Sequence, residues 1–127
     1  MNLTEKIDSL KEYGPAILRI AMALVFLWFA INQFIAPNDW TGYLPGFLAS
    51  TANPVIFVYA NAVFELIFAG LLIAGVFTRL AALLLGLHLI GISVAPGYNA
   101  IAIRDYGLAL ATLSIVLTGP DKLCMKK

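Results

Sequence analysis

The sequence contains one cysteine and one histidine, Cys124 and His88. A lone cysteine excludes an internal disulfide and a paired-cysteine redox motif. One cysteine and one histidine also supply too few ligands for a tetrahedral zinc site, so we expect no metal site within one chain. Charge is scarce as well, at 12% of residues with a net charge of +1. The basic surface that nucleic acid requires is therefore absent, and we expect no nucleic-acid partner.

What the sequence does have is apolar length. Hydrophobic residues make up 61% of its 127 positions, and the mean hydropathy is +0.91. About 20 helical residues cross the hydrocarbon of a bilayer, and the charged residues leave apolar stretches of about this length. The pattern predicts an all-α integral membrane four-helix bundle that forms a single domain over residues 1–127. The predicted spans are about 15–36, 54–77, 80–96 and 101–119, with a turn at residues 96–99.

The segment before the first span, residues 2–13, predicts a short amphipathic helix, because its apolar and charged residues fall on opposite faces. Asn2 and Glu5 have the spacing of a capping box. The helix is expected either on the membrane surface or in solvent, and the pattern fits both.

The loop at residues 37–53 carries several large apolar side chains. They are Trp40, Tyr43, Leu44, Phe47 and Leu48. Because aromatic rings settle at headgroup depth, we expect this outer loop to lie on the membrane interface as an aromatic anchor. The alternative is a lid over the mouth of the bundle.

Glu65 is a carboxylate in the middle of the second predicted span, where the surrounding residues are apolar. An ionised carboxylate in hydrocarbon costs several kcal/mol unless it is paired, protonated or turned toward a polar cavity. Asn61 lies one helical turn earlier on the same face. Arg19 in the first span and His88 in the third are its candidate partners.

The depths of these groups suggest an internal cavity. A rise of 1.5 Å per residue separates Arg19 from Glu65 by roughly 10 Å of depth, so direct contact is marginal. His88, water or a ligand headgroup would fill the gap. Arg19 has an alternative role, in which it reaches outward to lipid phosphates.

The other polar candidates have both structural and ligand-binding interpretations. Gln33 and Asn61 either hydrogen-bond between helices or contact a ligand. Arg104 and Asp105, near the start of the fourth span, are expected to pair with each other, with headgroups or with a neighbouring helix. The predicted ligand-binding set is therefore Arg19, Glu65, His88, Asn61, Gln33, Arg104 and Asp105.

Small residues predict two places where helices pack closely. One is Gly70 with Ala74 in the second span, and the other is Ala82 with Gly86 in the third.

The distribution of positive charge predicts the orientation. With four spans, six basic residues share the side of both termini, whereas Arg104 alone lies on the other side. The positive-inside rule therefore predicts that both termini face the cytoplasm. The localisation we expect is the plasma membrane of a prokaryotic cell, crossed several times.

Three segments resemble the DoxX family of small four-helix membrane proteins. They are ILRIAMALVFLWFAINQF, FELIFAGLLIAGVFTRLAALLLG and IRDYGLALATLSIVLTGPDKL. The matching polar positions are Arg19, Glu65, Arg79, Arg104 and Asp105. The chain departs from the family at Gln33, where a lysine is frequent, and at residues 121–124, where a Gly-Arg-Ser-Leu-like ending is usual.

The resemblance implies a link to quinone-coupled redox chemistry, because the family includes a subunit of a thiosulfate:quinone oxidoreductase. The leading hypothesis is a membrane subunit that binds a quinone or similar lipid-like ligand through Arg19, Glu65 and His88. Phe26, Phe64 and Phe68 would contact the ligand's ring or tail. A redox partner protein would carry the electrons, with membrane lipid and a second copy of the chain as further candidate partners.

Two other functions compete with this hypothesis. A small proton-coupled transporter would use Glu65 as its proton site, although cationic partners would oppose the raised pKa that this role needs. A structural or assembly factor would use the polar residues only to hold the helices in register.

Overall fold

The computed structural model describes residues 2–44, 46–94 and 100–126, and it contains helices but no strand within these ranges. The elements are α1 (Leu3–Asp8), α2 (Tyr13–Ile35), the 3-10 helix η1 (Pro37–Tyr43), α3 (Gly46–Ala49), α4 (Val55–Ala74), α5 (Thr78–Val94) and α6 (Ala100–Thr118). Helices suit such apolar sequences because they satisfy every backbone hydrogen bond within the segment.

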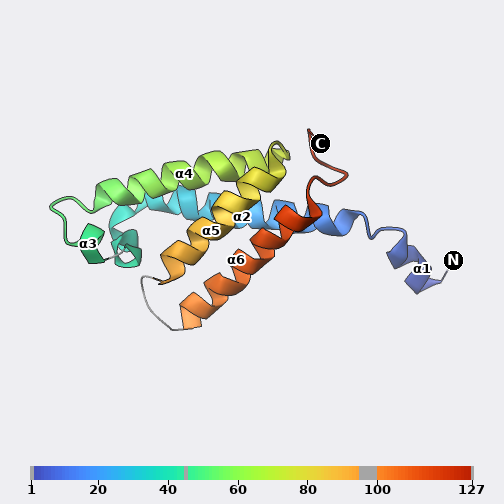
Figure 1. Ribbon diagram of the computed structural model, residues 1–127, viewed down its shortest axis with the longest axis horizontal. Coiled ribbons are helices and arrows are strands. Elements are labelled where there is room, and N and C mark those ends of the chain that lie inside the picture. Colours follow the sequence, from blue (N-terminus) through green and yellow to red (C-terminus); the bar gives the residue numbers. More distant parts are fainter. Residues whose placement is uncertain (1, 45, 95–99, 127) are drawn as a thin grey trace.

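The four long helices pack as two pairs. Helix α2 lies along α4, and α5 lies along α6, while the contacts between the pairs are less extensive. Figure 1 shows that the pairs run close together at one end of the bundle and diverge toward the other. Fully buried alanines, which include Ala23, Ala69, Ala82 and Ala109, allow the helices to approach in the core.

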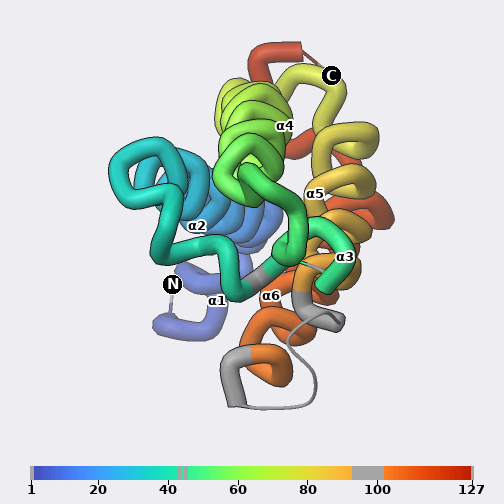
Figure 2. The backbone as a smooth tube through the Cα atoms, turned by 90° about the vertical axis from the view of Figure 1, so that its left-hand side faces the viewer, coloured from blue at the N-terminus to red at the C-terminus, as the bar shows by residue number. Residues whose placement is uncertain are grey.

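The two ends of the bundle differ. Both chain termini lie at the end where the pairs converge, and η1 and α3 lie at the opposite end (Figure 1). Figure 2 views the molecule from this opposite end and shows η1 beside α2, with α3 in front of the bundle. We call the two ends the terminal end and the loop end.

The helix positions agree with the sequence pattern. Each long helix begins and ends within three residues of its predicted span. Helices α2 and α4 are long and apolar enough to cross a membrane, and Thr78–Ile92 is a shorter apolar segment. The turn predicted at residues 96–99 lies outside the described residues.

The N-terminal segment is helical over a shorter range than predicted. Helix α1 ends at Asp8 rather than near residue 13, and turns lead into α2. Its capping box is present, with the Glu5 backbone N–H donating to Asn2 Oδ1 at 2.9 Å. The Asn2 backbone N–H donates to Glu5 Oε2 at 3.3 Å.

One of the two predicted close-packing positions is correct. A Cβ on Gly86 would lie 2.6 Å from Leu113 Cδ2, so α5 and α6 are in close contact there. A Cβ on Gly70 would meet no atom within 4 Å, so no other helix of the described residues packs closely there. The seam predicted at Gly70 and Ala74 is therefore not formed within the chain. The apolar exposed side chains beside it, such as Ile67, show that this part of α4 faces outward.

Candidate functional site: a polar cluster at the base of a cavity

A cavity of about 820 Å³ opens between the two helix pairs at the loop end. Its walls come from all four long helices, η1, Leu44 and α3. The aromatic wall residues are Trp28, Phe29, Trp40, Phe57 and Phe64. The divergence of the pairs explains the position of the cavity, because side chains from the pairs no longer meet where the helices separate.

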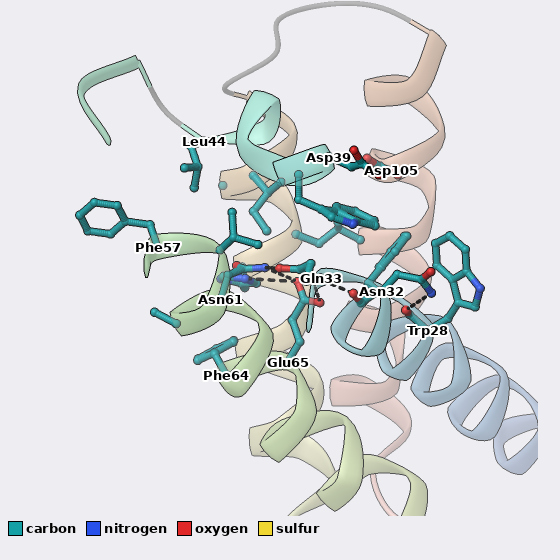
Figure 3. A pocket seen from close by; sticks show the side chains of 18 of the residues that line it. Trp28, Asn32, Gln33, Asp39, Leu44, Phe57, Asn61, Phe64, Glu65 and Asp105 are labelled. Carbon is teal, nitrogen blue, oxygen red and sulfur yellow. Dashed lines mark hydrogen bonds and ion pairs between the residues drawn. The ribbon is translucent and has the colours of Figure 1, made fainter. Parts of the chain in front are cut away.

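Four side chains form a polar cluster in the wall of this cavity: Gln33, Asn61, Glu65 and His88. Gln33 Nε2 donates to Glu65 Oε2 at 3.0 Å, and Asn61 Nδ2 donates to Glu65 Oε1 at 2.9 Å. Asn61 Nδ2 also donates to Gln33 Oε1 at 2.6 Å (Figure 3). The carboxylate of Glu65 is only 3% exposed, so these amides replace the water that would otherwise solvate it.

Local helix geometry explains why the cluster forms. Asn61 and Glu65 are four residues apart on α4 and therefore lie on one face. Gln33 approaches from α2, and its Nε2 also donates to Phe29 O at 3.1 Å, which fixes the amide against its own helix. Of the two roles predicted for Gln33 and Asn61, the structure shows the hydrogen bonds between helices, and contact with a ligand stays a prediction.

His88 completes the cluster from α5. Its Nε2 lies 3.6 Å from Glu65 Oε1, which is beyond hydrogen-bond distance. This buried nitrogen has no hydrogen-bond partner among the described residues. The imidazole ring lies against Phe64, with ring centroids 4.5 Å apart, and this contact holds the ring beside Glu65.

Charged residues lie at another part of the cavity wall. Asp105 and Arg104 on α6 line the cavity together with Asp39 of η1. Asp105 is buried and Arg104 is exposed. Figure 3 shows Asp39 and Asp105 across the cavity from Gln33, Asn61 and Glu65. The site therefore has a buried polar cluster at one side and a charged margin at the other.

The outer loop is part of the cavity wall, which supports its interpretation as a lid. Trp40 packs edge-to-face on Phe29 and Trp28, with centroid distances of 5.7 and 6.3 Å. Leu44 and Leu48 also line the cavity. Trp40, Leu44 and Leu48 therefore have the positions that a lid requires, whereas Phe47 is 76% exposed, as expected for an anchor. The interfacial position of the loop stays a prediction.

Of the three aromatic residues that are predicted to contact a ligand, one, Phe64, lines the cavity. Phe26 is fully buried in the core, and Phe68 packs against the same core. Both face the helix contacts rather than the cavity because they lie nearer the terminal end, where the helix pairs converge.

Arg19 lies outside the cavity. Its Nε donates to Asp121 Oδ2 at 2.6 Å, and its Nη1 donates to the carbonyl oxygens of Leu72 and Ile73, each at 2.8 Å. The guanidinium is 1% exposed at the terminal end. The proposed grouping of Arg19 with Glu65 and His88 is therefore wrong, and so is the alternative that Arg19 reaches lipid phosphates.

Sequence reasoning missed Asp121 as the partner of Arg19. Asp121 follows Pro120 just after α6, and it lies at the terminal end with the first turns of α2. The sequence did hold a signal for this contact, namely the expected depth in the membrane. A carboxylate directly after α6 is expected at nearly the same depth as Arg19 near the start of α2. The Leu123 backbone N–H also donates to Asp121 Oδ1 at 2.9 Å.

These contacts determine the acidity of Asp121. Burial alone raises the pKa of the Asp121 carboxyl group. The hydrogen bonds from Arg19 and from the Leu123 N–H, together with the charge of Arg19, lower the pKa by more than burial raises it. The net pKa lies below the ordinary value. The Asp121 carboxylate is therefore ionised at neutral pH.

The fold and the cavity define an all-helical protein with a polar cluster enclosed among apolar helices. In comparisons with known proteins, the DoxX family model matches residues 14–95, which is more than half of the chain. The chain belongs to the DoxX family and is a membrane protein. The comparisons with curated proteins and with solved structures give no match.

Proposed function

We propose that this protein is a membrane subunit of a quinone-linked redox system and that its cavity binds a quinone-type or similar lipid-like ligand. The observation that carries the proposal is the cavity of about 820 Å³ with aromatic walls and a buried polar cluster. Ligand sites usually measure about 300–1,000 Å³ and combine apolar walls with a few oriented polar groups. An amphiphile with a polar ring and an apolar tail has the matching chemistry.

The aromatic walls and the polar cluster would bind different parts of such a ligand. The ring packs against Phe64 and Trp40, and its oxygen atoms meet the Glu65 and His88 side of the cavity. Offset or edge-to-face ring contacts contribute about 0.5–1.5 kcal/mol beyond the area that they bury. The tail extends between the diverging helix pairs.

A partner protein would have to carry the electrons. One cysteine and one histidine give neither a dithiol pair nor a pair of axial haem ligands within this sequence. The chain therefore supplies the ligand site, and the redox centre belongs to another subunit. DoxX membership supports the membrane part of this proposal.

We place the protein in the plasma membrane with α2, α4, α5 and α6 all crossing it and with both termini in the cytoplasm. The basic residues at the terminal end support this orientation: Lys6, Lys11, Arg79, Lys122 and Lys126. The cavity then lies in the outer half of the membrane.

The experiment is ligand binding to the purified protein in lipid nanodiscs. A decyl-tailed benzoquinone, tested in its oxidised and reduced forms, should bind in at least one form with one site per chain. Gln33→Leu should weaken the binding at least tenfold, because it removes an amide and leaves Glu65 with one donor fewer. Ser114→Ala is the matched control, since the Ser114 hydroxyl donates to Ala111 O within α6.

The main competing result concerns a structural role. The amide contacts join α2 to α4, so they would also serve a protein whose polar cluster only fixes helix register. If neither form of the probe binds to folded protein above empty nanodiscs, the ligand-binding proposal is wrong. Loss of the bundle in Glu65→Leu, with full cellular activity in Glu65→Gln, would then favour the structural role.

A further inference from the structure

The hydrogen-bond donors of the polar cluster are almost fully used within the protein. Gln33 Nε2 donates to Phe29 O and Glu65 Oε2, and Asn61 Nδ2 donates to Gln33 Oε1 and Glu65 Oε1. A side-chain amide has two N–H groups, so both amides have none left. Their orientation is fixed, because an ionised Glu65 accepts only and each amide must turn its nitrogen toward it.

The acceptors of the cluster are not used up. A carboxylate accepts about four hydrogen bonds, and Glu65 receives one on each oxygen atom from the amides. Its Oε1 lies 3.6 Å from the unpartnered His88 Nε2. The surface that the cluster offers to a ligand is therefore rich in acceptors, with one imidazole nitrogen beside them.

A hydroxyl group matches both free positions of this cluster, whereas a carbonyl group matches only His88. A hydroxyl placed between the two residues donates its hydrogen to Glu65 Oε1 and accepts from His88 Nε2–H. A carbonyl accepts only, so in the same place its lone pairs would face the carboxylate. Sites built around a substrate hydroxyl discriminate strongly against analogues that lack it, because their own polar groups are then left unpaired.

We infer that the cavity selects the reduced, hydroxyl-bearing form of its ligand, a quinol or another phenolic lipid, over the carbonyl form. The inference rests on the proposed function, since it concerns the same cavity, and it adds which form the site holds. Glu65 accepts the hydroxyl hydrogen and His88 positions the same oxygen.

The test compares three probes with the same ring skeleton and tail in nanodiscs under anaerobic conditions. They are a decyl-tailed benzoquinol, the corresponding quinone and the dimethyl ether of the quinol. The quinol should bind at least tenfold more tightly than the other two. Equal or tighter binding of the quinone would overturn the inference but leave the proposed function intact, whereas no binding of any probe would reject both.

A variant distinguishes hydrogen-bond chemistry from shape. Glu65→Gln keeps the size of the side chain but adds an amide that can donate to a carbonyl. The preference for quinol should fall at least fivefold in this variant, while Ser114→Ala should keep it. An unchanged preference in folded Glu65→Gln would contradict the role given to the carboxylate.

A cationic ligand is the competing hydrogen-bond donor. A decylammonium ion would also donate to Glu65, but it lacks the ring that the aromatic walls accommodate. Displacement of bound quinol by decylammonium at a lower concentration than by unlabelled quinol would overturn the inference. Failure of decylammonium to displace the quinol would support it.

Discussion

At the scale of single residues, the side chains of Glu65 and Arg19 are both buried, and different groups stabilise them. Glu65 is surrounded by neutral amides and a histidine, whereas Arg19 has an ionised carboxylate and two backbone carbonyls. The first arrangement leaves hydrogen-bonding capacity for a ligand. The second satisfies the charge completely and therefore serves stability.

Removing Asp121 should destabilise the bundle. Asp121→Ala leaves the 1% exposed guanidinium of Arg19 without its carboxylate, and breaking one side of a buried pair costs about 3 kcal/mol. Chemical unfolding in detergent micelles measures the loss. The exposed pair of Lys122 with Glu12 is the control, because Lys122→Ala should change the unfolding free energy very little.

The same carboxylate should make stability depend on pH in the acid range. Because its pKa in the folded state is lowered, the stabilisation is complete above the ordinary carboxyl pKa of about 3.9 and is lost as the pH falls through the lowered value. Unfolding free energies measured below about pH 4 should therefore converge for the natural protein and Asp121→Asn. A constant difference down to pH 2 would contradict this linkage.

At the scale of the elements, the segment after α6 is held against the end of α4. Met125 N–H donates to Ala74 O at 3.1 Å, and Lys126 N–H donates to Gly75 O at 3.2 Å. Gly75 ends α4 in the left-handed conformation, with φ of 75°. A Cβ there would lie 2.6 Å from Cys124 Cα, so this junction requires glycine.

Substitution of the two glycines near the end of α4 should have opposite effects. Gly75→Ala should destabilise the protein by at least about 1 kcal/mol, because of its positive φ and its contact with Cys124. Gly70→Ala should be neutral or stabilising by up to about 1 kcal/mol, since it has free space and a helical backbone. Thermal unfolding of the two variants tests this, and equal destabilisation would show that the close approach of residue 124 is unimportant.

At the scale of the whole molecule, the sequence predicted the helices well but predicted few of the contacts between residues that are distant in the chain. The apolar stretches predicted the four long helices, and the spacing of Asn61 and Glu65 predicted that they share a face. The contact of Arg19 with Asp121 joins residues 102 positions apart. It depends on the chain folding back after α6, for which no periodicity gives a signal. The contribution of Trp40 to the cavity wall depends in the same way on how the loop returns over the helices.

The orientation of the molecule is directly testable. A cysteine-reactive, membrane-impermeant label should reach a cysteine introduced at residue 127 only after the cells are opened, because we expect the basic terminal end to face the cytoplasm. A cysteine introduced at exposed Asp39 should be labelled in intact cells. The Cys124→Ala background removes the native thiol. The reverse pattern of labelling would place the cavity on the cytoplasmic side.

Arg19 and Asp121 are 102 positions apart in the sequence, so they are synthesised at different times. At about 5–20 residues per second, the ribosome adds Asp121 roughly 5–20 s after Arg19. If α2 crosses the membrane as we propose, it inserts during that interval with an uncompensated guanidinium, and its insertion relies on its apolar residues. A nascent chain interrupted before residue 121 never acquires the matching acid. Premature termination therefore leaves the guanidinium of Arg19 without the carboxylate that pairs with it in the folded protein.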